Sequence, residues 1–281
     1  KNGTIQEGIQ YHNLHALITQ REGVNQYGDA TDILESAYIR FYELMGFIPK
    51  PVSNHTKNFE RLFDDEIDLL IVVGGGALQP KWYDREHDEE IQPNRDRTEE
   101  KMIKYCIEHG IPIIATCRGM QYINVLFGGK LSYHPDLPVE RPRGKDHKVR
   151  LTTENREIYV NNYHQDVIYE DCLAPCFTPL AIDEENHVIE AYYSEKMKLL
   201  ALQWHPERQF ETSEAEEETR RIIFYKPAGT AWTFFTKIRF GYFLDLPFVS
   251  LKCYTKYRFR VLKQGYTVDK KRLRDRRQRN V

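Results

Sequence analysis

Short apolar runs that alternate with helical periodicity constrain the fold of this chain more than any other feature. Three of these runs, residues 15–19, 68–73 and 111–115, are largely aliphatic and have the length of buried parallel strands. Between them, helical spacing of apolar residues leads from Asp29 to a stop at Gly46, and a second helix is expected over residues 97–109. Strands and helices in alternation predict a parallel sheet with helices on both faces.

The other segments predict how this sheet begins and ends. Residues 47–52 are expected near an edge, because prolines cannot donate to a neighbouring strand. After Gly129 the pattern changes to short alternating runs, typical of a mixed or antiparallel extension: 149–152, 157–160, 177–182, 188–193 and 199–203. An acidic run at 211–218, followed by basic residues, indicates a closing helix. The predicted fold is therefore α/β, a three-layer, doubly wound and mostly parallel sheet with an antiparallel extension, formed by residues 14–225.

Charge is distributed unevenly along the chain. The 281 residues carry 40 Lys and Arg against 42 Asp and Glu, but residues 226–281 hold 15 of the basic and only 3 of the acidic side chains. We interpret these residues as a basic, aromatic C-terminal extension of unknown role. It is expected either to contact an anionic surface, as basic amphipathic segments do, or to be unrelated to the preceding domain. Residues 14–225 are acidic, so no nucleic acid is expected to bind them.

Composition narrows the class of protein and its location. With 41% apolar and 12% aromatic residues, the chain has enough apolar material for a core, which excludes collagen, coiled coil and general disorder. No stretch of about 18 uncharged apolar residues is present to span a membrane. Five cysteines are too few and too unevenly spaced for a disulfide framework, so we expect a reducing cytosol.

A cysteine stands where the third apolar run meets the next helix. Residues 111–121 read IPIIATCRGMQ, with Gly119 two positions after Cys117. This pattern is typical of a nucleophile elbow, a tight strand-to-helix turn that lifts a side chain out of the sheet's carboxyl edge. The NH groups at the helix start and the cation of Arg118 are expected to lower the pKa of the thiol. The alternative is a buried structural cysteine at a strand end.

A histidine and a glutamate follow the last apolar run. Residues 203–207 read QWHPE, and in an extended chain His205 and Glu207 point the same way. The carboxylate can then orient the ring while the other ring nitrogen faces Cys117, which is the arrangement of orienter, base and nucleophile. The alternative is a histidine that only caps the strand.

Three glycines follow the second apolar run directly. Residues 74–76 have no side chains that would block their amides, and the adjacent strand should be the one that ends at Cys117. An amide of this loop and the NH of Arg118 are expected to flank one carbonyl oxygen, as donors of an oxyanion hole do. The loop is not a phosphate loop, because the Gly-Lys-Ser/Thr ending is missing.

Three motifs in order resemble the class I glutamine amidotransferase-like superfamily, which has a flavodoxin-like fold, and within it the γ-glutamyl hydrolase branch, peptidase C26. The motifs are CRGMQ at 117–121, NYHQ at 162–165 and QWHPE at 203–207. The resemblance covers roughly residues 14–225. It implies that Cys117 is the nucleophile, His205 the base and Glu207 its orienter.

The same resemblance implies an activity and further site residues. The chain is expected to hydrolyse γ-glutamyl amides through a γ-glutamyl thioester, with no cofactor and no metal. Gly75, Gly76 and Arg118 would supply the oxyanion amides. Gln121 would contact the γ-glutamyl group of a small substrate, and the pocket would be lined by Asn162, Tyr163 and His164.

Two other functions stay open at this point. One is a glutaminase subunit that supplies ammonia to a separate synthetase, which together with a second copy of this chain is the expected protein partner. The other is a domain that binds γ-glutamyl ligands without catalysis. The released amine also stays open: the stretch between His147 and Val160 is shorter than expected for γ-glutamyl-GABA hydrolases, and a γ-glutamyl-CDP-amidate hydrolase is similar in outline.

Overall fold

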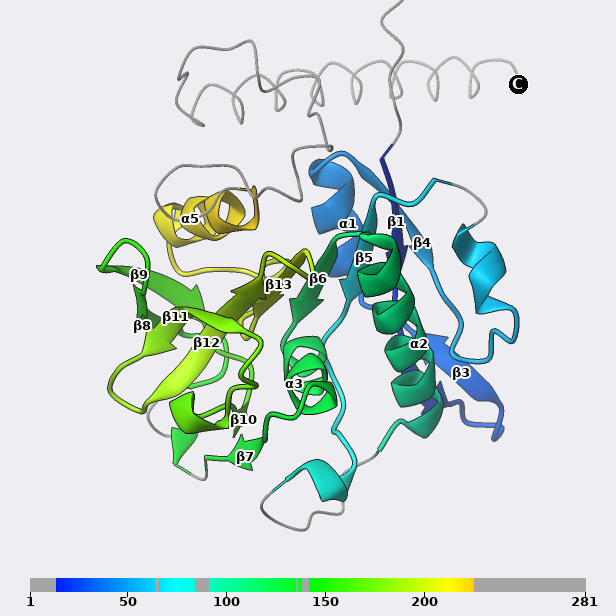
Figure 1. The fold of residues 1–281 in the computed structure, drawn as a ribbon, viewed down its shortest axis with the longest axis horizontal. Helices are drawn as coiled ribbons and strands as arrows, with labels where there is room; N and C mark the ends of the chain where they lie inside the picture. The colour runs from blue at the N-terminus through cyan, green and yellow to red at the C-terminus, as the bar shows by residue number, and fades with distance from the viewer. Residues whose placement is uncertain (1–13, 64–65, 84–90, 135, 138–141, 225–281) are drawn as a thin grey trace, which may run out of the picture. The chain divides into compact units, whose positions relative to one another are not determined.

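The computed structural model describes residues 14–63, 66–83, 91–134, 136–137 and 142–224. The predicted extension 226–281 lies outside the described residues. The centre of the described part is a nine-stranded sheet with the order β4-β1-β5-β6-β13-β12-β11-β8-β9 (Figure 1). None of the described helices is both long and apolar enough to cross a membrane.

Five adjacent strands of this sheet run parallel. In spatial order they are β4 (Phe47–Pro51), β1 (Leu14–Ile18), β5 (Leu69–Val72), β6 (Ile113–Thr116) and β13 (Leu199–Leu202). This is the order of a flavodoxin-like doubly wound sheet, in which β4 forms the edge. The carboxyl ends of β5, β6 and β13 lie next to one another, at the edge where ligands bind in such sheets.

Four strands extend the sheet in antiparallel order. They are β12 (Val188–Ser194), β11 (Thr178–Asp183), β8 (Asp146–Leu151) and β9 (Arg156–Asn161). The predicted antiparallel extension is confirmed, and it accounts for almost half of the strands. Side chains on both faces of β12 are buried, so this strand brings side chains into the interior rather than to a solvent-exposed face.

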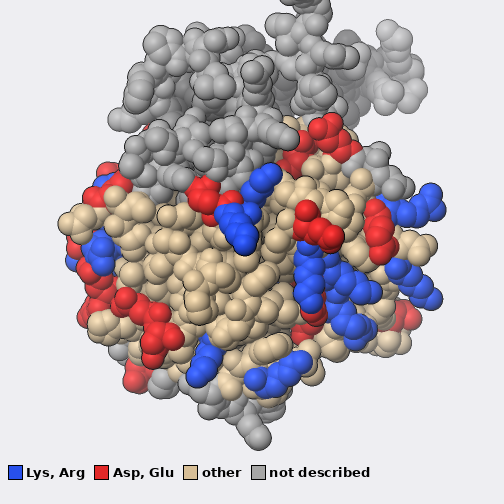
Figure 2. All heavy atoms as spheres, in the orientation of Figure 1, with Lys and Arg blue, Asp and Glu red and all other residues tan. Residues whose placement is uncertain are grey.

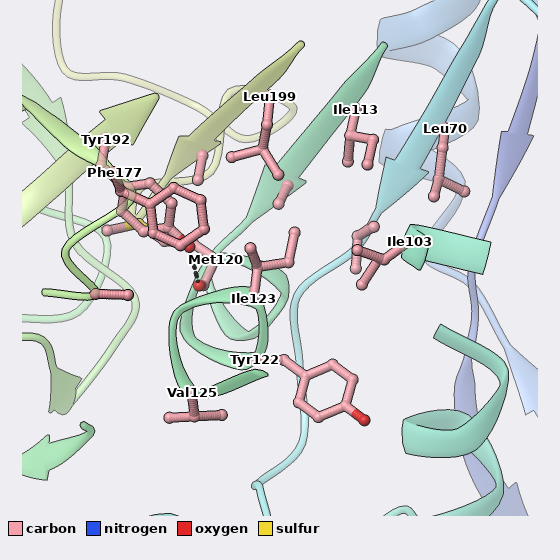
Figure 3. Packing of buried hydrophobic residues seen from close by; sticks show 14 of the residues in the cluster. Leu70, Ile103, Ile113, Met120, Tyr122, Ile123, Val125, Phe177, Tyr192 and Leu199 are labelled. Carbon is pink, nitrogen blue, oxygen red and sulfur yellow. Dashed lines mark hydrogen bonds between the residues drawn. The ribbon is translucent and has the colours of Figure 1, made fainter. Parts of the chain in front are cut away.

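Helices cover the sheet on both sides and complete the three layers. α2 (Pro93–His109) and α3 (Arg118–Leu126) lie in front of the sheet in Figure 1, α1 (Ser36–Leu44) lies behind it, and α5 (Ser213–Phe224) contacts β9. Figure 3 shows the front layer, where Ile103 and Ile123 pack against Leu70, Ile113 and Leu199. All five are fully buried, so the helices are held by the apolar face that their spacing predicted.

The segment from Asp29 to Ile33 differs from the sequence prediction. The first helix starts at Ser36, and a hairpin of β2 (Arg21–Val24) and β3 (Ala30–Ile33) precedes it. Asn25 explains the difference, because its side-chain oxygen accepts from the amides of Tyr27 and Asp29 and closes the hairpin turn. α2 also starts earlier than predicted, with Pro93 in its first turn.

Short elements fill the connections. They are the two-stranded pair β7 (Ser132–Tyr133) and β10 (Asp166–Val167) and three 3₁₀ turns, η1 (Phe59–Phe63), η2 (Pro80–Trp82) and η3 (Glu170–Cys172). β10 follows the NYHQ motif directly, so the β7 pairing fixes the end of the segment that carries this motif.

Candidate active site

Cys117 lies in a sharp turn between β6 and α3. Its backbone has φ 51° and ψ −111°, a strained conformation for a residue with a Cβ, and strain of this kind clusters at functional sites. The Cys117 amide continues the sheet by donating to the Leu202 carbonyl at 2.7 Å. Gly119 allows the turn to pack, since a Cβ there would lie 2.5 Å from the Val72 carbonyl oxygen. The turn therefore has the geometry of the elbow that the sequence predicted.

His205 and Glu207 follow β13 and lie beside this turn. The Nδ1 atom of His205 is 2.7 Å from Oε1 of Glu207, and their side chains are 3% and 1% exposed. Asn161, at the end of β9, holds the His205 backbone twice: its Oδ1 accepts from the His205 amide at 3.0 Å and its Nδ2 donates to the His205 carbonyl at 2.9 Å. The imidazole is thus fixed at both its ring and its main chain.

Charge pairing between Cys117 and His205 shifts both of their pKa values. Burial raises the pKa of the Cys117 thiol, but the charge of His205 and a hydrogen bond with it outweigh burial and leave this pKa lowered. Burial lowers the pKa of His205, yet Cys117 and Glu207 raise it to about 9. The arrangement favours a thiolate beside an imidazolium at neutral pH.

Tyr38 on α1 also contacts this pair. The sequence analysis treated it only as part of an apolar helix face. Its hydroxyl accepts from the Gly74 amide at 2.9 Å and lies 3.5 Å from Nδ1 of His205. Burial and the Glu207 carboxylate raise the pKa of Tyr38 well above its ordinary value, so the hydroxyl keeps its proton. Periodicity cannot distinguish such a tyrosine from one in the core.

The glycine loop after β5 lies directly against Cys117 and His205. A Cβ on Gly74 would be 2.9 Å from Cε1 of His205 and 3.1 Å from the Cβ of Cys117, so only glycine allows this close approach. Gly75 and Gly76 have φ of 82° and 80°, in the left-handed region that glycine occupies without strain. The predicted neighbourhood of this loop and the cysteine is therefore present.

Arg95 on α2 holds the carbonyl side of the glycine loop. Its fully buried guanidinium donates to the carbonyls of Val73 at 2.5 Å, Gly75 at 2.6 Å and Gly74 at 3.2 Å. In a trans peptide the amide points opposite to the carbonyl. The amides that follow the Gly74 and Gly75 carbonyls therefore point away from Arg95.

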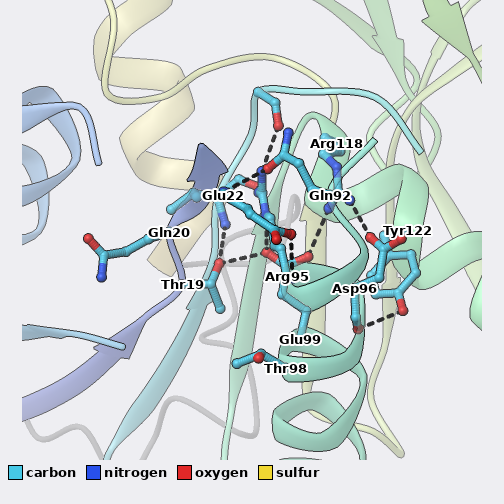
Figure 4. A network of polar contacts seen from close by, with 12 residues as sticks. Thr19, Gln20, Glu22, Gln92, Arg95, Asp96, Thr98, Glu99, Arg118 and Tyr122 are labelled. Carbon is cyan, nitrogen blue, oxygen red and sulfur yellow. Dashed lines mark hydrogen bonds and ion pairs between the residues drawn. The ribbon is translucent and has the colours of Figure 1, made fainter. Parts of the chain in front are cut away.

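Arg118 differs from the sequence prediction. Its guanidinium forms ion pairs with Asp96 and, at 2.9 Å, with Glu99, both on α2, instead of turning towards Cys117 (Figure 4). Only the backbone NH of Arg118 acts on the thiol, as a hydrogen-bond donor. The predicted cation beside Cys117 is thus corrected to a backbone amide, and the side chain belongs to the buried network that attaches α3 to α2.

Gln121 and Asn162 are buried near the site and use their polar groups within the protein. The Nε2 of Gln121 donates to the Asp166 carbonyl at 3.1 Å and to Oε1 of Gln203 at 3.2 Å. The Asn162 carbonyl accepts from the Gly144 amide at 2.7 Å. These contacts join the NYHQ segment to α3 and to the end of β13.

Tyr163 and His164 lie on either side of the reactive pair. The Tyr163 ring meets the His205 ring edge-on at 5.4 Å and carries the Arg208 guanidinium over its face at 4.4 Å. The charge of His164 interacts with Cys117 and contributes to the lowered pKa of the thiol. The two neighbours in the motif thus contact different members of the pair.

The sequence analysis did not single out two further buried groups. Glu190 on β12 is fully buried, and its Oε1 lies 3.2 Å from Nε2 of His147 on β8 and 3.6 Å from Nε2 of His164. A glutamate inside the apolar run 188–193 was the available signal, because a buried charge requires a partner. In the described ranges, no group of three His, Cys, Asp or Glu side chains is arranged to hold a metal ion.

Comparisons with known proteins agree with this geometry. The family model described as Peptidase C26 matches residues 14–207, from the first strand to Glu207. The crystal structure of a GMP synthase-like protein from Thermoplasma acidophilum superposes with a TM-score of 0.52 at 21% identity, over 76% of this chain and 94% of that one. At this identity the likeness shows a shared fold, that of the class I glutamine amidotransferases.

Two curated relatives are similar in sequence over most of their length. The "putative glutamine amidotransferase-like protein YvdE" of Lactococcus lactis is 28% identical over 63% of this chain and 79% of that protein. The γ-glutamyl-γ-aminobutyrate hydrolase of Shigella flexneri is 26% identical over 73% of this chain and 88% of that protein.

Proposed function

Because the chain belongs to the peptidase C26 family, we propose that it hydrolyses the γ-glutamyl amide bond of a small substrate, with Cys117 as the nucleophile. Its γ-glutamyl-γ-aminobutyrate hydrolase relatives support a hydrolase. The residues and the thioester mechanism are our proposal. One observation carries it: a buried thiol of lowered pKa hydrogen-bonds to a histidine that a buried glutamate orients.

In the first step, the Cys117 thiolate attacks the γ-amide carbonyl and the carbonyl oxygen becomes an oxyanion. His205, charged because Cys117 and Glu207 raise its pKa, gives its proton to the leaving nitrogen. The carbon–nitrogen bond breaks, the amine leaves, and a γ-glutamyl thioester remains on Cys117.

In the second step, the neutral His205 takes a proton from a water molecule, which attacks the thioester carbonyl. Glutamate leaves, and the thiolate and imidazolium form again. Glu207 acts through His205, since its hydrogen bond at 2.7 Å keeps the ring oriented in both steps.

We propose the amides of Gly75, Gly76 and Arg118 as donors to the oxyanion. The carbonyls that precede the two glycine amides are bound to Arg95, which supports amides that point towards the opposite side. The Arg118 NH already donates to the sulfur of Cys117, so it lies within reach of an atom bonded to that sulfur. One such donor contributes on the order of 100- to 1000-fold in rate.

The γ-glutamyl group is proposed to bind among Gln121, Asn162, Tyr163 and His164. Because Gln121 and Asn162 already make internal hydrogen bonds, we assign them to shaping the pocket as well as to contacting the ligand. The enzyme depends on a free thiol, which places it in a reducing cytosol.

Replacement of Cys117 tests the proposal. The Cys117→Ala variant should release no glutamate from any γ-glutamyl amide, because no other group in this site can form the thioester. A panel of γ-glutamyl conjugates and free glutamine is incubated with each variant, and glutamate is measured. The matched control is Cys176→Ala, which removes an exposed thiol and should keep full turnover. Glutamate release by Cys117→Ala would refute the proposed nucleophile.

The same panel distinguishes the glutaminase function, for which relatives named glutamine amidotransferase-like argue. A γ-glutamyl hydrolase should prefer conjugates of larger amines to glutamine. A glutaminase subunit should prefer free glutamine, with weak turnover that a synthetase partner increases. A binding domain without catalysis should turn over neither and should lack a fast-reacting thiol at Cys117.

A further inference from the structure

His164 makes contacts that define its protonation state. Its Nδ1 lies 3.0 Å from the main-chain carbonyl of Asp166, and its Nε2 faces Oε1 of Glu190 at 3.6 Å. A carbonyl oxygen and an ionised carboxylate accept hydrogen bonds and donate none. A neutral ring would direct one nitrogen lone pair at an acceptor, so the geometry requires a proton on both nitrogens.

Glu190 stays ionised in the interior for a related reason. It is fully buried, and an isolated carboxylate there would be neutralised. Two imidazoles prevent this, since His147 at 3.2 Å and His164 at 3.6 Å share the same carboxylate oxygen. Although burial raises the pKa of Glu190, these two histidines hold it well below its ordinary value.

The charged groups around His164 act in one direction. Burial lowers the pKa of its ring, but Glu190, the Cys117 thiolate and the Asp166 carbonyl together leave the pKa raised. The elements packed around the ring contribute Cys117 from the elbow, Glu190 from β12, His147 from β8 and Asp166 from β10. The Asp166 carboxylate itself accepts from the Tyr83 hydroxyl at 2.8 Å.

Cys117 thus has two imidazoles near it, and each is backed by a buried carboxylate. They differ in what their protons do. In the proposed mechanism, His205 must release its proton to the leaving amine, so its charge is lost once in every turnover. The His164 protons are held between two acceptors, and no step of the reaction uses them.

We propose that Glu190, supported by His147, keeps His164 as a permanent imidazolium whose charge stabilises the Cys117 thiolate independently of His205. Glu190 and His147 are positioning residues that act through His164. The inference rests on the proposed role of Cys117 as nucleophile, and it adds a second source of thiol activation. Thiolate is then retained even when His205 is neutral.

The pH dependence of Cys117 alkylation tests this proposal without a substrate. The full-length chain is treated with iodoacetamide between pH 5 and 10, and modification of Cys117 is measured by mass spectrometry. In Glu190→Gln, His164 loses its counter-charge, so the alkylation midpoint should rise by about one pH unit, a tenfold slower reaction below the midpoint. Glu190→Asp keeps the charge and should recover part of the shift.

A remote pair provides the matched control. Glu170 and His187 form an exposed carboxylate–imidazole contact at 3.2 Å, so Glu170→Gln makes the same chemical change away from the site and should leave the midpoint unchanged. If circular dichroism shows that Glu190→Gln is unfolded, His164→Gln takes its place, with the same expected rise. An unchanged midpoint in a folded Glu190→Gln or His164→Gln chain overturns the proposal.

A second background isolates the two imidazoles. In His205→Asn, the remaining depression of the Cys117 midpoint should depend on Glu190 and disappear in the double variant. These readouts also distinguish the inference from the proposed function. A Glu190-dependent midpoint with no turnover of any γ-glutamyl amide would refute only the function, whereas turnover with a Glu190-independent midpoint would refute only the inference.

Discussion

Cys117 and His205 titrate as a coupled pair, so the pH dependence of turnover follows from their shifted pKa values. The pKa of the thiol is lowered and that of His205 is raised to about 9. The rate constant kcat/KM should fall on the acid side as the thiolate gains a proton. It should fall on the alkaline side near pH 9, where His205 loses the proton that the leaving amine needs.

Replacement of Glu207 checks which residue sets the alkaline limit. The Glu207 carboxylate raises the pKa of His205, so Glu207→Gln should move the alkaline limit to lower pH and reduce the maximal rate. The measurement is a kcat/KM profile for both chains. Glu211→Gln removes an exposed carboxylate that pairs with Lys145 and serves as the control. An alkaline limit that stays in place in Glu207→Gln would assign it to another group.

At this scale, the sequence predicted contacts that are local and missed those that depend on distant segments. His205 and Glu207 are two positions apart, so spacing alone brought them together. The partners of Arg118 lie on α2, about twenty positions earlier in the chain, and no local pattern indicated that its guanidinium would turn there. Glu190 was missed because its histidines come from two other segments of the chain.

The elbow between β6 and α3 depends on how closely the helix approaches the sheet. A Cβ on Gly119 would lie 2.5 Å from the Val72 carbonyl oxygen and 3.0 Å from its carbonyl carbon, and backbone atoms cannot move aside cheaply. We therefore expect Gly119→Ala to lower the free energy of unfolding by about 1–3 kcal/mol, the usual cost of overpacking. Because α3 would shift, the alkylation rate of Cys117 should fall as well.

Urea unfolding monitored by circular dichroism measures this effect. The matched control is Gly23→Ala on β2, where the added Cβ meets the end of the flexible Ile33 side chain, 2.7 Å from its Cδ1. That side chain can rotate, so the control should change stability by less than about 1 kcal/mol. Equal losses in the two variants would contradict the close approach of α3 and β5.

Elements with strong periodicity were predictable, and the exceptions have a physical cause. The buried strands that lead to Gly74, Cys117 and His205 were predicted to within a residue or two, because both of their faces are covered. The β2–β3 hairpin was assigned in part to a helix, since its apolar residues also fit a helical spacing. Its turn is formed by one Asn25 side chain, a contact that periodicity does not report.

Charge at the scale of the whole chain separates the described domain from the residues that follow it. Figure 2 shows acidic and basic side chains interspersed on one face, where α2 carries an ion pair between Lys104 and Glu100. Residues 226–281 instead hold 15 basic and 3 acidic side chains. A concentration of one sign attracts anionic surfaces in a manner that salt weakens.

Deletion of residues 226–281 tests how the two parts of the sequence divide the work. All residues proposed for the site lie between Tyr38 and Glu207, and α5 already packs on β9, so turnover of γ-glutamyl amides should persist in the chain 1–225. The full-length chain should be retained on a heparin column at low salt and released as salt rises, whereas the acidic shortened chain should pass through. A folded shortened chain without turnover would show instead that the basic extension contributes to the site.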